Sequence, residues 1–295
     1  KEQPEYAEST ISYAGRLDPM AEGVLILLVD EENKKREKYQ GLDKEYIFEV
    51  LFGLETDTYD LLGIVNRITN FQFPIFKEEK EEENGSGGSE PARGKTSVVS
   101  ADPTPEVGES GWLRNSPPQL EQKAIKYIEN MIGKRTQKYP PYSSYTIEGK
   151  PLFQWAKEGR IDEIDLPEKE IVIYESEYLG KRTISAKKLH QTIIERVSKV
   201  EGKFRQKEIL KRWAMFFEDS KGPNSLKPGL PKHNPGLFPS TPSFPILKFR
   251  IACSSGTYIR QIAHKLGQVT GTGALCFHIK RTRVGEYKSK NSIHL

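Results

Sequence analysis

Apolar and polar residues alternate along several stretches of the chain in a way that predicts strands. Val24–Val29 is a short continuous apolar run, which is typical of a buried strand. Glu45–Phe52 combines aromatic and β-branched residues with partial alternation, and Ile246–Ala252 alternates cleanly. Ile171–Tyr174, with its flanking residues, is a fourth candidate.

Apolar residues spaced three and four apart predict helices between these strands. The predicted helices cover Gln119–Lys134, Ala186–Val200, Arg205–Phe217 and Tyr258–Leu266. Ser185 is a suitable N-cap for the second helix, and Gly267 is expected to end the last one. Because strands and helices follow no regular alternation, we predict an α+β fold with a mixed, mostly antiparallel sheet flanked by helices.

Two stretches carry neither pattern. Residues 78–111 begin with EEKEEENGSGGSE and hold almost no apolar side chains, so we predict a disordered insertion there. Residues 221–243 contain six prolines and are predicted to form a Pro-rich surface loop. Since motifs lie on both sides of these stretches, we expect residues 1–295 to form a single domain.

Composition narrows the class of protein. The 295 residues include 45 basic and 41 acidic side chains, a net charge of +4, and no apolar run is long enough to span a bilayer. With only Cys253 and Cys276, a disulfide framework is excluded, and we expect reduced thiols in a cytoplasmic protein. Residues 244–295 hold nine basic residues against one acid, which suits a polyanionic partner such as RNA and, equally well, a solvated basic face.

The segment Tyr13–Gly23, YAGRLDPMAEG, places Asp18 on a turn directly before the first apolar run. The proline after Asp18 keeps this residue out of the helical region, so its carboxylate is held on a loop next to a strand. Loops on rigid scaffolds often carry catalytic groups. The alternative from composition alone is that Asp18 only turns or caps the chain.

A second motif, Ala252–Gly267 (ACSSGTYIRQIAHKLG), places Arg260 in the first turn of a helix. The positive end of the helix dipole disfavours an arginine there, so Arg260 is expected to have a carboxylate or phosphate partner. Cys253, at the preceding strand end, is interpreted as a core residue rather than a nucleophile. His264 is interpreted as packed or solvated.

Further motifs lie between these two. Asp57 and Asp60 in GLETDTYDLLG could bind a cation, but side-chain hydrogen bonds within a turn are the expected role, because no metal-site spacing is present. In Gln137–Gly159, aromatic residues alternate with proline, serine and lysine. That mixture suits stacking on bases and contact with phosphates, although a Pro-rich surface loop is the alternative.

Taken in order, these motifs and the closing IKRTRVG resemble the TruB family of tRNA pseudouridine synthases. The resemblance implies the pseudouridine synthase fold with a thumb-like insertion at Gln137–Gly159, and the isomerisation of a T-loop uridine of tRNA, position 55, to pseudouridine. It implies no cofactor and no metal. It also implies tRNA, through its T arm, as the partner, and no membrane. A monomer is the expected oligomeric state.

The resemblance also implies roles for single residues. Asp18 matches the family's catalytic carboxylate, and Arg260 matches the arginine that pairs with this carboxylate. Tyr46 matches the tyrosine that stacks on the uracil and is a candidate acceptor for the C5 proton. The positions implied to bind substrate are Tyr13, Lys44, Tyr258, Ile279, Lys280 and Arg281. Of these, Lys280 and Arg281 are expected to contact phosphates as a basic pair.

The sequence departs from the family pattern in three places. Tyr13 replaces the usual histidine, the N-terminal KPxG-type motif is absent, and no C-terminal PUA-type domain follows Tyr287. An alternative hypothesis is therefore a non-catalytic tRNA-binding or tRNA-folding module of the same ancestry. A glycoside hydrolase that uses Asp18 with Asp57 or Asp60 is a third hypothesis, which leaves the basic C-terminal segment unexplained.

Overall fold

A computed structural model describes residues 6–66, 117–219 and 243–291. The predicted segments 78–111 and 221–243 lie outside the described residues, except for Ser243. The strands are β1 Ile11–Ala14, β2 Ala21–Gly23, β3 Ile26–Val29, β4 Lys44–Phe52, β5 Glu55–Thr56, β6 Val65–Asn66, β7 Gly133–Lys138, β8 Thr146–Ile147, β9 Lys150–Pro151, β10 Glu168–Ser185, β11 Ser243–Cys253, β12 Ala274–Val284 and β13 Tyr287–Lys288. The α-helices are α1 Arg36–Gln40, α2 Pro117–Glu129, α3 Leu152–Lys157, α4 Ala186–Ser198, α5 Gln206–Asp219 and α6 Ile259–Thr270.

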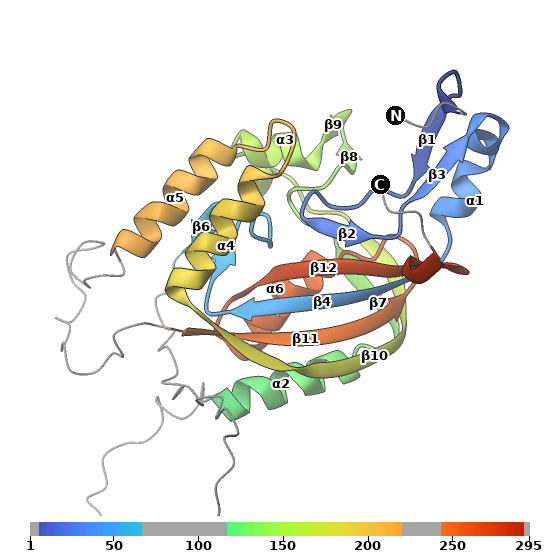
Figure 1. The fold of residues 1–295 in the computed structure, drawn as a ribbon. Coiled ribbons are helices and arrows are strands. Elements are labelled where there is room, and N and C mark those ends of the chain that lie inside the picture. The colour runs from blue at the N-terminus through green and yellow to red at the C-terminus, as the bar shows by residue number, and fades with distance from the viewer. Residues whose placement is uncertain (1–5, 67–116, 220–242, 292–295) are drawn as a thin grey trace, which may run out of the picture.

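A central sheet with the strand order β13-β12-β4-β11-β10-β7 organises the molecule (Figure 1). Neighbours along this order are antiparallel, and β2 adds a parallel pairing to β12. The predicted α+β fold with a mixed, mostly antiparallel sheet is therefore confirmed.

The two faces of the sheet bury separate hydrophobic cores. On β4, Phe48 and Val50 point to the core shared with α2 and α6, whereas Leu51 points to the core shared with α4 and α5. This separation follows from the period of two in a strand, which sends successive side chains to opposite faces. In Figure 1, α6 lies behind the sheet, and α4 and α5 lie side by side near one end of it.

Most predicted elements are present, with shifted ends. The helix predicted to end at Gly267 continues to Thr270, and Gly271 ends it with a left-handed φ of 71°. Gly267 serves a different purpose, since a Cβ there would lie 2.1 Å from the backbone nitrogen of Ala274. It allows α6 to approach β12 closely.

Two other predictions are corrected. The run Val24–Val29 is not a buried strand: only Ile26–Val29 is a strand, it pairs with β1 in a two-stranded ribbon, and Leu25 and Leu27 are exposed. The helix predicted to reach Lys134 ends at Glu129, and Gly133 begins β7, a polar strand at the sheet's edge. The polar sequence of β7 carries no apolar alternation that would have revealed it.

Candidate active site

The loop that carries Asp18 connects β1 to β2 and is held by a buried arginine from β12. Arg281 is 2% exposed, and its guanidinium donates to the backbone carbonyls of Val24 at 2.7 Å, Gly15 at 3.1 Å and Arg16 at 3.5 Å. A Cβ at Gly23 would lie 2.2 Å from the Arg281 carbonyl oxygen. The glycine thus lets the end of the loop lie directly against β12.

Asp18 forms a two-bonded ion pair with Arg260 of α6. The Arg260 Nε donates to Oδ2 at 2.8 Å and its Nη2 donates to Oδ1 at 2.9 Å. Arg260 is buried, whereas the Asp18 side chain keeps 27% of its surface exposed. Bidentate pairs of this kind fix the orientation of the carboxylate. Asp18 is therefore held in one position with part of its surface open to a ligand.

The guanidinium of Arg260 also forms hydrogen bonds to the segments that contain Thr58 and Tyr142. Its Nη1 donates to the Thr58 carbonyl at 2.6 Å and its Nη2 to the Tyr142 carbonyl at 3.2 Å. The start of α6 is fixed by Gln137, which accepts from the Tyr258 amide at 2.8 Å and donates to its carbonyl at 3.1 Å. The carboxylate partner expected for Arg260 from its place at the helix start is thus present.

A second carboxylate belongs to this cluster. Asp60 is 3% exposed, and its Oδ2 lies 3.7 Å from the Nε of Arg260. Its Oδ1 accepts from the Thr58 hydroxyl at 2.7 Å and from the Leu62 amide at 2.9 Å, which confirms the predicted turn chemistry. Burial raises the pKa of Asp60, against the opposing effect of Arg260. Sequence reasoning missed the contact with Arg260, for which a turn motif gives no signal.

Tyr46 and Tyr258, both predicted site residues, lie close enough to Asp18 for its charge to affect their pKa values. Burial raises the pKa of Tyr46 to about 12 and that of Tyr258 to about 12, and the charge of Asp18 contributes to both increases. Because its pKa is about 12, the phenol of Tyr46 is protonated at neutral pH. Tyr46 lies in the middle of the sheet, opposite Ile251 on β11 and Arg281 on β12.

Three other residues predicted to bind substrate, Ile279, Tyr13 and Lys44, form none of the contacts described above for Asp18 and Arg260. Ile279 is 4% exposed within the core shared with α2 and α6. Tyr13 lies on β1, where the guanidinium carbons of Arg16 and Arg36 are each 5.8 Å from its ring centre. Lys44 is buried, and its Nζ donates to the Gln40 carbonyl at 2.6 Å and to that of Leu42. This placement favours a structural role for Lys44.

The neighbouring basic residues Lys280 and Arg281 do not act as a pair. Lys280 is exposed, with its Nζ 3.8 Å from a carboxylate oxygen of Glu22. Arg281 points to the other face and is enclosed by the backbone carbonyls of the Asp18 loop. The expectation that both contact phosphates is therefore corrected for Arg281, which positions the loop instead.

The cysteines are core residues, as interpreted from the sequence. Cys253 and Cys276 are free, and both are buried. Burial raises the pKa of Cys253 to about 11 and that of Cys276 well above its usual range, so neither is a thiolate at neutral pH. A nucleophilic cysteine is thereby disfavoured.

The described residues offer neither a metal-binding cluster nor a membrane-spanning helix. Within residues 6–66, 117–219 and 243–291, no group of three or more His, Cys, Asp or Glu side chains is arranged to hold a metal ion. In the same ranges, no helix is both long enough and apolar enough to cross a membrane.

The site thus consists of an ordered, partly exposed carboxylate, a buried guanidinium and nearby tyrosines on an α+β scaffold. Residues 5–85 match the family model described as TruB family pseudouridylate synthase (N terminal domain). That matched range contains Asp18, Tyr46 and Asp60. Residues 5–85 are therefore similar to the N-terminal domain of TruB family pseudouridylate synthases.

Similar proteins cover most of the chain. The tRNA pseudouridine synthase B of Syntrophus aciditrophicus is 24% identical over 283 residues, which is 96% of this chain and 56% of that protein. That of Parabacteroides distasonis is 23% identical over 276 residues, 94% of this chain and 72% of that protein. The chain thus spans little more than half the length of the first of these relatives.

Solved structures are more distant. A chain in the crystal structure of a Cbf5-Nop10-Gar1 complex is 14% identical, with a TM-score of 0.41 over 95% of this chain and 41% of that chain. A chain in the structure of an H/ACA RNP bound to a substrate RNA containing 2′-deoxyuridine is 13% identical, with a TM-score of 0.38 over 95% of this chain and 40% of that chain.

Proposed function

We propose that this chain is a tRNA pseudouridine synthase that isomerises the T-loop uridine at position 55, with Asp18 as the catalytic carboxylate. The observation that carries the proposal is the bidentate pair between Asp18 and Arg260. This pair joins two motifs, 242 residues apart in the chain, to which the resemblance gives one active site. The family match and the relatives named tRNA pseudouridine synthase B support the same conclusion.

The reaction conserves all atoms of the nucleotide. The bond between C1′ of the ribose and N1 of the uracil breaks, the base turns, and C5 bonds to C1′. The proton on C5 is lost and N1 gains one. Asp18 acts on the ribose, by attack at C1′ or by removal of a sugar proton, and Arg260 keeps its carboxylate oriented. A target base must leave its stack to reach such a site, which costs least in a loop.

Tyr46 is assigned to stacking on the uracil. Its phenol has a pKa of about 12, raised by burial, so it is protonated in the resting enzyme and is a poor acceptor for the C5 proton at neutral pH. An aromatic ring beside the base offsets part of the cost of unstacking. Replacing Tyr46 by Phe is therefore expected to preserve more turnover than replacing it by Ala.

Loss of the C5 proton provides a direct test of the activity. An unmodified tRNA transcript labelled with tritium at C5 of uridine should release tritium with the wild-type protein and not with Asp18→Asn. Asp43→Asn is the matched control, because Asp43 is an exposed carboxylate whose Oδ1 is 3.1 Å from the Tyr174 hydroxyl. Tritium release by Asp18→Asn would reject Asp18 as the catalytic group. Binding without release by the wild-type protein would favour the non-catalytic module.

A further inference from the structure

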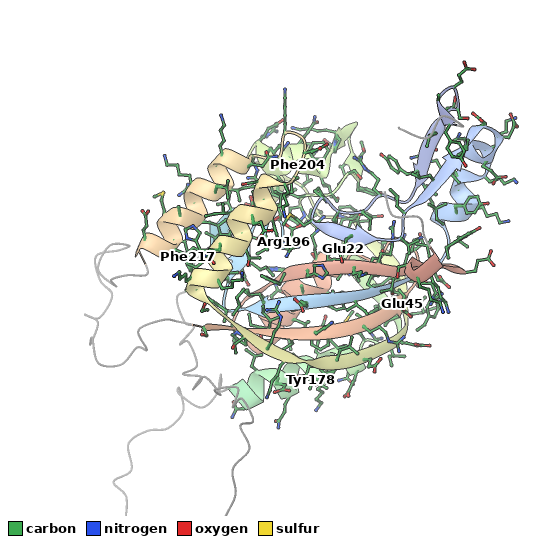
Figure 2. The ribbon with its side chains drawn as sticks, viewed as in Figure 1. Glu22, Glu45, Tyr178, Arg196, Phe204 and Phe217 are labelled. Atoms are coloured by element: carbon green, nitrogen blue, oxygen red, sulfur yellow. The ribbon has the colours of Figure 1, made fainter. Side chains whose placement is uncertain are left out.

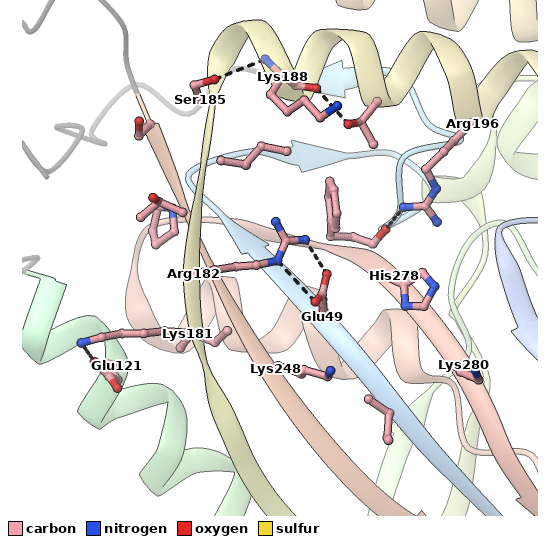
Figure 3. Close-up of a pocket in the computed structure, with 18 of the residues that line it drawn as sticks. Glu49, Glu121, Lys181, Arg182, Ser185, Lys188, Arg196, Lys248, His278 and Lys280 are labelled. Carbon is pink, nitrogen blue, oxygen red and sulfur yellow. Dashed lines mark hydrogen bonds and ion pairs between the residues drawn. The ribbon is translucent and has the colours of Figure 1, made fainter. Parts of the chain in front are cut away.

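A large groove lies on the sheet face opposite Tyr46. It has a volume of about 1470 Å³ and lies beside α4 over β10, β11, β4 and β12, with Leu120 and Glu121 from the start of α2 also in its lining (Figure 3). Ile47 lines this groove, and Tyr46, its neighbour in the same strand, packs against the core on the other face. The groove is larger than the ~300–1,000 Å³ of pockets that enclose small molecules. Its size suits a polymer.

The charged side chains in the lining of the groove are mostly cationic. Its basic side chains are Lys181, Arg182, Lys188, Arg196, Lys248 and Lys280. Its acidic side chains are Glu49 and Glu121, which pair with Arg182 at 2.7 Å and Lys181 at 2.9 Å. Lys188 and Lys248 are exposed and form no ion pair with any residue in the described ranges. The two lysines therefore present positive charge to solvent, and Lys248 lies opposite Glu49 in the register of β11 and β4.

One residue that lines the groove, Arg196, contacts the loop that carries Asp18. Arg196 of α4 donates to the Phe277 carbonyl at 2.5 Å and to the Met20 carbonyl at 3.4 Å. Met20 follows Asp18 by two residues. Figure 2 shows Arg196 on α4 and Glu22 on β2 near the same edge of the sheet, where β2 pairs with β12. Arg196 thus links the lining of the groove to the Asp18 loop.

The chemistry of the lining favours phosphates over bases. Two aromatic rings, Phe277 and His278, line the groove. Phe277 is only 6% exposed, and the guanidinium carbons of Arg182 and Arg196 lie 5.2 Å and 5.5 Å from its centre, so it offers little surface for base stacking. Ammonium and guanidinium groups without stacking surfaces bind the sugar–phosphate backbone independently of sequence.

From these observations we propose that the groove binds the sugar–phosphate backbone of the tRNA outside the T arm, while the T loop occupies the Asp18 site. The proposal rests on the proposed function for the identity of the RNA. It assigns Lys188 and Lys248 as phosphate contacts. In this proposal α4 both lines the groove and contacts the Asp18 loop through Arg196.

The test compares the double variant Lys188→Gln/Lys248→Gln with a matched control, Lys126→Gln/Lys265→Gln, which removes two exposed lysines from α2 and α6. Binding of an unmodified full-length tRNA transcript and of an isolated T-arm hairpin is measured across a salt series. For the groove variant, we expect full-length tRNA to bind about tenfold more weakly relative to the hairpin. The slope of log affinity against log salt should fall by about 1.5, and the control should match the wild type.

Two results would overturn the proposal. One is a groove variant that binds full-length tRNA with the affinity and salt dependence of the control. The other is an equal loss for full-length tRNA and hairpin, because the groove would then not be a separate surface. Failure of the proposed function is a different result: no version of the protein would form pseudouridine, whatever the binding measurements give.

Discussion

The Oδ2 atom of Asp60 lies 3.7 Å from the Nε of Arg260, the same nitrogen that donates to Asp18 at 2.8 Å. One buried guanidinium is therefore shared by two carboxylates. Asp60 is almost fully buried, whereas Asp18 is partly exposed. This asymmetry leaves Asp18 available to a ligand and assigns Asp60 to the support of Arg260.

The shared guanidinium predicts a pH dependence of stability. Burial raises the pKa of Asp60 in the folded protein, so between its usual value near 3.8 and the raised value the folded state holds a proton that the unfolded chain has released. The free energy of unfolding contributed by Asp60 therefore falls as pH rises through this window. Asp60→Asn removes the titration, so the stability of the variant relative to wild type should increase upward from about pH 4. Urea unfolding at several pH values measures this difference, and a constant difference would contradict the assignment.

The burial of Arg260 predicts a large loss of stability when it is removed. Arg260→Ala leaves Asp60 buried without its cation, which typically costs about 3–5 kcal/mol. Arg250→Ala is the matched control, since Arg250 contacts three glutamates but its side chain is 30% exposed. Screening by water limits its expected cost to about 1 kcal/mol. Equal losses in urea unfolding would show that burial is not the deciding factor.

Adjacent basic residues on β12 should give opposite phenotypes. Arg281→Ala leaves backbone carbonyls of the Asp18 loop without their hydrogen-bond donor. We therefore expect the free energy of unfolding to fall by about 3 kcal/mol, and turnover to fall because the loop is no longer held in place. Lys280→Ala should change stability by less than about 0.5 kcal/mol, because its side chain is exposed. It should instead weaken tRNA binding. A stable Arg281→Ala variant with weakened binding would restore the interpretation of a basic pair.

The close contact at Gly23 gives a fourth prediction. Gly23 and Gly133 have similar left-handed φ values of 108° and 101°, so alanine is strained at both. Only at Gly23 would the added Cβ meet backbone, the Arg281 carbonyl oxygen at 2.2 Å; at Gly133 no described atom lies within 4 Å. Gly23→Ala should therefore cost at least about 2 kcal/mol more than Gly133→Ala. Thermal unfolding of the two variants measures this difference in stability. Similar melting temperatures would contradict the prediction that Gly23 packs against the backbone of Arg281.

Much of the fold was predictable because its elements carry local patterns. The helices α4 and α5 follow from apolar spacing, and β4 and β11 from alternation. The misassigned Gly267 shows the limit of such patterns. A glycine in the sequence looks the same whether it ends a helix or allows α6 to approach β12.

The candidate site was predictable only in part. The place of Arg260 in the first turn of a helix indicated that it needs an anionic partner. The family resemblance identified Asp18 as that partner. Neither argument could reveal Asp60, since it reaches Arg260 only through the docking of its turn against β12, where the Cys276 amide donates to the Tyr59 carbonyl at 2.8 Å. The burial of Arg281 was also hidden, because an exposed and a buried arginine carry the same sequence signal.

We propose above that the protein converts the T-loop uridine of tRNA to pseudouridine with Asp18 as the catalytic carboxylate. The most direct test incubates the protein with an unmodified tRNA transcript and maps pseudouridine by carbodiimide-dependent stops in primer extension. We predict a stop at the T-loop uridine with the wild-type protein and with Asp43→Asn, and none with Asp18→Asn. A stop at that uridine with Asp18→Asn, or none with the wild-type protein while tRNA is bound, would contradict the account.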